Sequence, residues 1–169
     1  MSILRLLTLL VALLAPGVAL ACSCMWSGPF TKVALGTDLV VLGEVRSYYR
    51  HSMDVAVIEV LKGGEDRREI RVWGDSGALC RHYVTAFPRG TRWIFALKRL
   101  GEPTARDYAI SVCGEYWLEV LDGQVAGRIT VAEHGGMKES APLPDMLAWI
   151  RSGGATPLAP VPTAGPPGR

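Results

Sequence analysis

The sequence contains no asparagine, and this absence excludes N-linked glycosylation, which requires an Asn-X-Ser/Thr acceptor. It also lacks a block of basic residues, and the formal net charge of its 169 residues is only +2 at pH 7. Because nucleic-acid binding needs clustered Lys and Arg to neutralise phosphates, we expect no nucleic-acid partner. With 49% hydrophobic and 20% charged residues, the composition excludes a collagen-like, coiled-coil or wholly disordered chain.

The apolar run near the N-terminus is too short to span a membrane. It covers residues 6–14 and is interrupted by the Pro-Gly pair at 16–17, whereas a span needs about 20 apolar residues. The small residues at Ala19 and Ala21 suit cleavage by signal peptidase. We therefore predict a signal peptide over residues 1–21, a mature chain beginning at Cys22, and a secreted or periplasmic protein with no transmembrane segment after cleavage.

The rest of the chain divides into one domain and a tail. Residues 22–152 are enough for a real hydrophobic core, and we expect them to form a single monomeric domain. Residues 153–169 are rich in Pro and Gly with little to bury, so we predict a disordered tail there.

All four cysteines lie in the predicted mature chain, which is bound for an oxidising compartment, so two disulfides are the default expectation. Four cysteines allow three connectivities. A Cys22–Cys24 pair is disfavoured because a three-residue ring strains the Cα separation that a disulfide requires. Each of the other two connectivities ties the N-terminus to distant segments at Cys80 and Cys113. Either pattern indicates that this end of the chain must be held still.

Cys22 also allows a different interpretation, because it directly follows the small residue Ala21. A cysteine in that position can be the acylated residue of a lipoprotein, which would anchor the protein to a membrane. The preceding Ala19-Leu20 differs from a typical lipobox, where a large aliphatic residue comes first and a small one second. Acylation would also leave three other cysteines, an odd number for an exported protein. The lipid-anchored alternative stays open here.

Catalytic and metal-binding combinations are incomplete, so we expect no enzyme and no cofactor. The Gly-Asp-Ser-Gly sequence at 74–77 matches the surroundings of a serine-protease nucleophile, but only His51 precedes it and two barrels would not fit. We interpret it as a tight turn. The sequence Cys80-Arg81-His82 suggests a thiol nucleophile, which must be a free cysteine, yet a cysteine of an exported domain is expected to be paired. One residue between Cys22 and Cys24 is too few for a zinc knuckle.

Short apolar, β-branched and aromatic runs separated by turn residues predict an all-β fold, best matched by an OB-type closed antiparallel barrel of five to seven strands. Short helices are predicted at 29–35 and 143–150, and Asp122-Gly123 predicts a two-residue hairpin turn. The predicted strands cover residues 38–49, 53–61, 69–73, 92–100, 107–112, 115–121 and 124–131.

Six segments carry a resemblance to a known family. They are Cys22-Ser23-Cys24, residues 37–41, residues 60–63, residues 77–80, residues 90–96 and residues 111–114. Their order and spacing resemble the N-terminal domain of the tissue inhibitors of metalloproteinases and, more broadly, the netrin-like module. The resemblance covers the chain from Cys22 to about Leu121.

The resemblance implies an OB-fold barrel with the N-terminus tied across it by disulfides Cys22–Cys80 and Cys24–Cys113. In that family, the α-amine and carbonyl of the first cysteine chelate the catalytic zinc of a target metalloprotease, a role that falls here on Cys22. The pocket-facing role falls on Ser23. Further protease contacts are implied for Met25, Trp26, Ala78, Leu79 and Cys80.

Three hypotheses follow. In the first, the protein is an exported metalloprotease inhibitor that acts through the free amine of Cys22 and contacts no zinc except that of its target. In the second, it is a netrin-like extracellular module that binds protein without inhibiting it. In the third, Cys22 is lipidated and its amine is blocked.

Overall fold

The computed structural model describes residues 24–101, 107–130 and 138–159, so the predicted signal peptide, Cys22 and Ser23 lie outside the described residues. The described strands are β1 (Leu39–Tyr49), β2 (Ser52–Lys62), β3 (Glu69–Trp73), β4 (Arg92–Arg99), β5 (Asp107–Ala109), β6 (Trp117–Leu121), β7 (Gln124–Gly127) and β8 (Glu139–Pro142). The helices are α2 (Phe30–Val33), α3 (Leu143–Arg151) and the 3-10 turns η1 (Ala34–Gly36) and η2 (Val84–Ala86). No described helix has the length and apolar character to cross a membrane.

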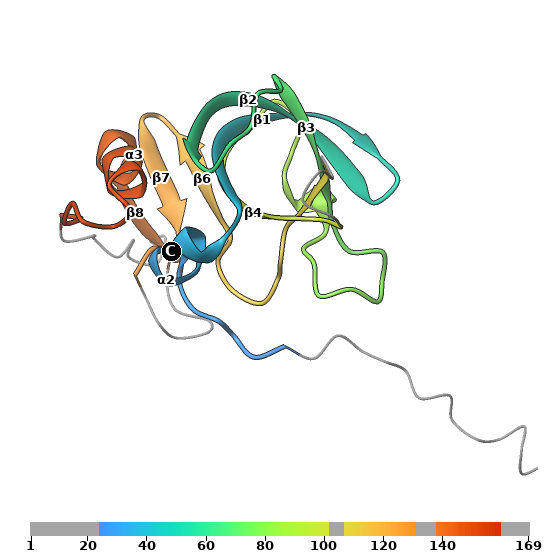
Figure 1. The fold of residues 1–169 in the computed structure, drawn as a ribbon, viewed down its shortest axis with the longest axis horizontal. Coiled ribbons are helices and arrows are strands. Elements are labelled where there is room, and N and C mark those ends of the chain that lie inside the picture. Colours follow the sequence, from blue (N-terminus) through green and yellow to red (C-terminus); the bar gives the residue numbers. More distant parts are fainter. Residues whose placement is uncertain (1–23, 102–106, 131–137, 160–169) are drawn as a thin grey trace, which may run out of the picture.

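Five strands close a barrel, which confirms the predicted all-β barrel fold with short flanking helices (Figure 1). Their order is β1-β2-β3-β5-β4, and pairing of β1 with β4 completes the ring. Every neighbouring pair in the ring is antiparallel except β3 and β5, which are parallel. Strand directions can alternate all the way round a ring only when the number of strands is even. A five-stranded barrel must therefore contain a parallel pair.

Three more strands extend the sheet outside the barrel. Strand β6 pairs with the first half of β4, and β7 and β8 follow in order. The predicted hairpin turn joins β6 to β7, with Asp122 at φ 51° and Gly123 at φ 74°. These two left-handed residues are what a type I′ turn requires. Helix α3 then packs against β2, β7 and β8 (Figure 1).

Burial along β1 and β4 is continuous instead of alternating. Residues 39–43 of β1 and 93–97 of β4 are all buried. Since successive side chains point to opposite faces of a strand, continuous burial means that both faces are covered. One face lines the barrel, while η1 packs against β4 on the flank. Met146, Trp149 and Ile150 of α3 belong to the same hydrophobic core.

Both predicted helices are present. The first is α2 followed directly by η1, and the second is α3, which extends one residue beyond the predicted end. The predicted tail begins at Gly153. Within it, Leu158 is partly buried against the core, and residues 160–169 lie outside the described part of the chain.

Gly43 marks a close approach between β1 and β2. A Cβ atom there would lie 2.5 Å from Val55 Cγ1 and 3.1 Å from the Ala56 carbonyl oxygen. The β1–β2 ladder also shifts register at this point, between Leu42 and Gly43, as expected where a strand bends round a barrel.

We expect Gly43→Ala to lower the free energy of unfolding by about 1–3 kcal/mol, because the added methyl overpacks the strand pair. Urea unfolding would measure this. Gly36→Ala is the matched control, since its Cβ would meet no atom within 4 Å, and we expect a change within about 0.5 kcal/mol. Equal stability of the two variants would contradict the close approach.

Candidate functional site

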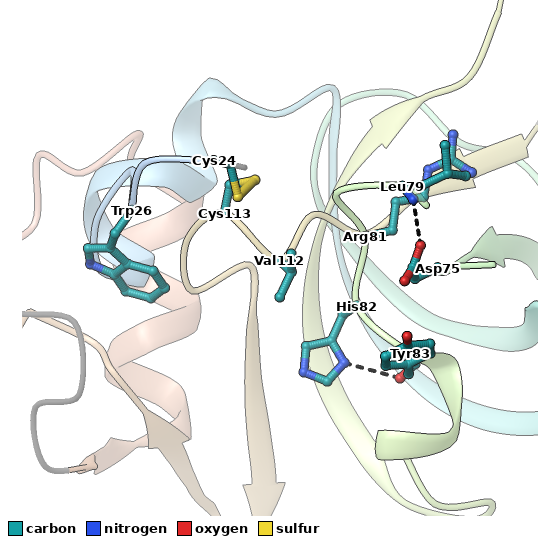
Figure 2. Close-up of a pocket in the computed structure, with 9 residues that line it drawn as sticks. All are labelled: Cys24, Trp26, Asp75, Leu79, Arg81, His82, Tyr83, Val112 and Cys113. Carbon is teal, nitrogen blue, oxygen red and sulfur yellow. Dashed lines mark hydrogen bonds between the residues drawn. A yellow bond between two sulfur atoms is a disulfide. The ribbon is translucent and has the colours of Figure 1, made fainter. Parts of the chain in front are cut away.

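Three segments far apart in the sequence enclose a pocket of about 380 Å³ (Figure 2). They are the N-terminal segment, which we define as residues 24–31, the loop of residues 74–83 after β3, and the loop of residues 110–116 after β5. The pocket lining brings together the predicted site residues Cys24, Trp26 and Leu79. The remaining lining residues are Asp75, Arg81, His82, Tyr83, Val112 and Cys113.

Disulfides lie at the edge of this pocket. Cys24 and Cys113 are bonded, with a Cα–Cα distance of 5.7 Å, as the family resemblance implied (Figure 2). Cys80 is also disulfide-bonded, and its predicted partner Cys22 lies outside the described residues. The sulfur atoms of Cys24, Cys80 and Cys113 all lie within 4.8 Å of one another. Because these three sulfurs are in disulfides, none of them offers a thiolate to a metal.

Backbone hydrogen bonds fix the N-terminal segment along its length. Its partners come from the loop after β5 and from the residues that follow β7, both late in the domain. These bonds run from Ser27 N–H to the Cys113 carbonyl, from Glu115 N–H to the Gly28 carbonyl, from Phe30 N–H to the Arg128 carbonyl and from Thr31 N–H to the Ile129 carbonyl, with N···O distances of 2.7 to 3.1 Å. A segment that would normally fray is thereby held against the barrel.

The carboxylate of Asp75 orders the loop that carries Leu79. It accepts a hydrogen bond of 2.7 Å from the Leu79 backbone N–H, drawn in Figure 2. That bond, assisted by the Gly77 N–H and the Tyr83 hydroxyl, lowers the pKa of Asp75 against the opposing effect of desolvation. The Asp75 backbone N–H also donates to the His82 carbonyl at 3.1 Å. The loop is therefore organised around an ionised carboxylate.

We expect Asp75→Ala to speed hydrogen exchange of the Leu79 amide about tenfold, because the amide loses its acceptor and opens locally. Ser76→Ala, an exposed position in the same loop, is the control and should leave that rate unchanged. The pKa of Asp75 is lower in the folded protein than in the unfolded chain. The stability that ionised Asp75 gives to the folded state is therefore complete above the ordinary Asp pKa and is lost as the pH falls through the lowered pKa. Unchanged Leu79 exchange in Asp75→Ala would remove Asp75 from this role.

Exposed apolar side chains of Leu79, Tyr83 and Val112 line the pocket, and exposed Met25 lies in the chain between the lining residues Cys24 and Trp26. Met25 is 92% exposed, Leu79 40%, Tyr83 57% and Val112 41%. Elsewhere in the described part of the chain, only Tyr49, Ile58 and Leu121 are large hydrophobic residues exposed in this way. Concentration of exposed apolar residues on one face is typical of a protein-binding surface.

The predicted contact residues take different positions on this face. Met25 and Ala78 are exposed, and Leu79 lies at the pocket rim. Trp26 is half-buried in the pocket wall, with the Arg128 guanidinium 5.2 Å from its ring centre. Ser23 lies outside the described residues.

Five lining residues were not predicted from the sequence: Asp75, Arg81, His82, Tyr83 and Val112. Asp75 carried a signal, since a tight turn at 74–77 was predicted, but its bond to Leu79 was not. His82 packs edge-on against Trp117, with ring centres 4.3 Å apart, and its Nδ1 lies 3.1 Å from the Tyr83 carbonyl oxygen. No sequence spacing indicated those contacts.

A separate polar cluster at the end of β2 serves the fold. The Glu65 carboxylate accepts hydrogen bonds from Arg67 and from the Tyr108 hydroxyl, at 2.7 and 2.8 Å. The Arg67 bonds, with help from Tyr108, lower the pKa of Glu65 to about 2. Because Tyr108 lies in β5, its hydrogen bond to Glu65 ties the β2–β3 connection to the barrel.

In comparisons with known proteins, no protein-family model and no curated protein matches the chain.

Proposed function

We propose that the protein is an exported inhibitor of zinc metalloproteases, and that the mature N-terminus chelates the target's catalytic zinc through the α-amine and carbonyl oxygen of Cys22. The observation that carries the proposal is the immobilised N-terminal segment. The Cys24–Cys113 disulfide holds it beside a loop that Asp75 orders, and exposed apolar residues flank both.

The chemistry of the target supports this assignment. A catalytic zinc ion keeps one coordination position open for water or substrate. A neutral amine and the carbonyl of the same residue can form a five-membered chelate that displaces this water. The free amine has a pKa of about 7.7–8.0, so zinc competes with a proton. Holding the segment in place beforehand removes the entropy cost of ordering it during binding.

The remaining contacts follow from position in the segment. We assign Ser23 to the specificity pocket of the protease, and Met25 and Trp26 to the surface beside it. Ala78, Leu79 and Cys80 would form the second side of the contact. Met25 and Leu79 expose enough apolar surface to contribute strongly when buried, since burial of a large apolar side chain is worth about 1.5–3 kcal/mol.

The test is inhibition of a panel of zinc metalloproteases by oxidised protein that begins at Cys22. We expect inhibition of at least one member at submicromolar concentration. Complete lack of inhibition across the panel, by protein with both disulfides verified, would contradict the proposal.

The exposed apolar face also suits the second candidate, a netrin-like module that binds protein without inhibiting it. Binding through that face does not require a free amine at Cys22. Protein acetylated at the Cys22 amine separates the two functions. Under the inhibitor proposal acetylation removes activity, whereas a binding module keeps its partner. A mature mass that includes acyl chains would instead establish the lipid-anchored form.

A further inference from the structure

A second pocket, of about 290 Å³, adjoins the first. Trp26, His82 and Val112 line both, so the two pockets are neighbouring halves of one groove. The second half is lined in addition by Glu115, Trp117, Arg128 and Lys138. It therefore combines aromatic walls with the charged side chains of Glu115, Arg128 and Lys138, and none of these three residues belongs to the assigned inhibitor contacts.

Within this second half, the accessible charges are positive. The Glu115 side chain is only 7% exposed, whereas that of Arg128 is 27% exposed and Lys138 is an exposed residue. Glu115 already accepts hydrogen bonds from the Arg128 backbone N–H at 3.3 Å and from Arg128 Nη1 at 3.5 Å. A ligand that enters from solvent meets two cations first and the carboxylate last.

Arg128 keeps binding capacity at the pocket. Its guanidinium has five N–H donors, and the contact with Glu115 uses one nitrogen at the long end of the hydrogen-bond range. Stacking over Trp26, at 5.2 Å, holds the group in place. Lys138, for its part, makes no ion pair with any residue that the structure describes.

We propose that this half of the groove binds a carboxylate on an apolar stem, the chemistry of a glutamate side chain in the bound partner. Arg128 and Lys138 contact the carboxylate, and Trp26 and Trp117 pack against the stem. A charge-assisted bond from a positioned guanidinium is roughly twice as strong as a neutral hydrogen bond. That the partner is a protease rests on the proposed function, whereas the carboxylate site does not.

The experiment titrates oxidised mature protein with phenylacetate and, separately, with benzylamine, which has the same ring and stem but the opposite charge. Indole N–H resonances of Trp26 and Trp117, assigned with Trp→Phe variants, report binding. We expect phenylacetate to shift both with a dissociation constant on the order of 1 mM, as a fragment of this size allows. Benzylamine should bind at least about tenfold more weakly. Equal or tighter binding of benzylamine, or no shift with phenylacetate, overturns the proposal.

Variants locate the probe. Lys138→Gln and Arg128→Gln should each weaken phenylacetate binding by about tenfold, the loss of one charge-assisted contact. Lys138 is exposed, so its variant stays folded even if Arg128→Gln does not. Arg81→Gln, which removes the cation of the first pocket, should change nothing. If Arg81→Gln abolishes binding and Lys138→Gln does not, the proposal is wrong. No protease is present, so a failed inhibition assay leaves this result intact.

Discussion

Mature protein extended by one alanine before Cys22 is expected to lose at least about 100-fold in inhibition of any metalloprotease that the native form inhibits. The added residue converts the Cys22 amine into a peptide nitrogen, which has no lone pair to donate to zinc. It also inserts a residue where the metal must approach. A 100-fold loss corresponds to about 2.7 kcal/mol, a modest value for replacing a chelate.

The control for this experiment is the thermal stability of the extended protein, which reports whether the fold is intact. The disulfide and hydrogen bonds of the N-terminal segment involve residues 24–31, downstream of the extension, so thermal stability should be unchanged. A pH series adds a second readout. Inhibition through a free amine should weaken as the pH falls below about 7.7, because the proton occupies the donor. Full inhibition by the extended protein would show that the chelate is not used.

Replacement of both Cys24 and Cys113 by alanine is expected to cost about 2–5 kcal/mol in the free energy of unfolding, together with most of the inhibition. The disulfide joins residues separated by 89 positions, and a cross-link over so long a loop strongly restricts the unfolded chain. Without it, the N-terminal segment loses its covalent link to the loop after β5, and we expect the backbone hydrogen bonds nearest the missing disulfide to open more often. Denaturant unfolding measures the loss in the free energy of unfolding, and hydrogen exchange of the Ser27 amide measures the opening of the N-terminal segment.

The double variant leaves the Cys80 disulfide in place, so it separates the contribution of one cross-link from that of the other. Inhibition should be measured below the variant's unfolding temperature, where the barrel is intact. A loss of less than about 1 kcal/mol in the free energy of unfolding, with the Ser27 amide still protected, would mean that the Cys24–Cys113 disulfide is not needed to hold the segment.

Much of the barrel could be predicted from local sequence. β-Branched and aromatic runs with clear turn residues determine where β1 to β7 lie, and Asp122-Gly123 has the conformational freedom that its hairpin turn needs. Strand β8 could not be predicted in this way. Its sequence, Glu-Ser-Ala-Pro, has low strand propensity, and pairing with β7 makes it a strand. The buried side chain of Glu139, the first residue of β8, also accepts a hydrogen bond of 2.6 Å from the Thr130 N–H, which links β8 to the residues after β7.

The candidate site was only partly predictable, for a different reason. The residues around Cys24 and Cys80 carried a pattern in the sequence, and the cysteines indicated a fixed terminus. His82, Val112 and Arg128 belong to the groove only because three loops meet, and no local periodicity encodes that meeting. Tertiary geometry alone places a tryptophan, a histidine and an arginine from separate segments around one groove.

The bonds of the N-terminal segment also impose an order on the molecule's biosynthesis. Residues 24–31 leave the ribosome before the barrel strands, yet the groups that hold them, at Cys113, Glu115, Arg128 and Ile129, are made about 80 to 100 residues later. The leading end must therefore wait, unanchored, until nearly the whole domain has been translated. A chain that ends before Ile129 lacks some of these attachment points, so the N-terminal segment can reach its fully bonded position only after residue 129 has been made.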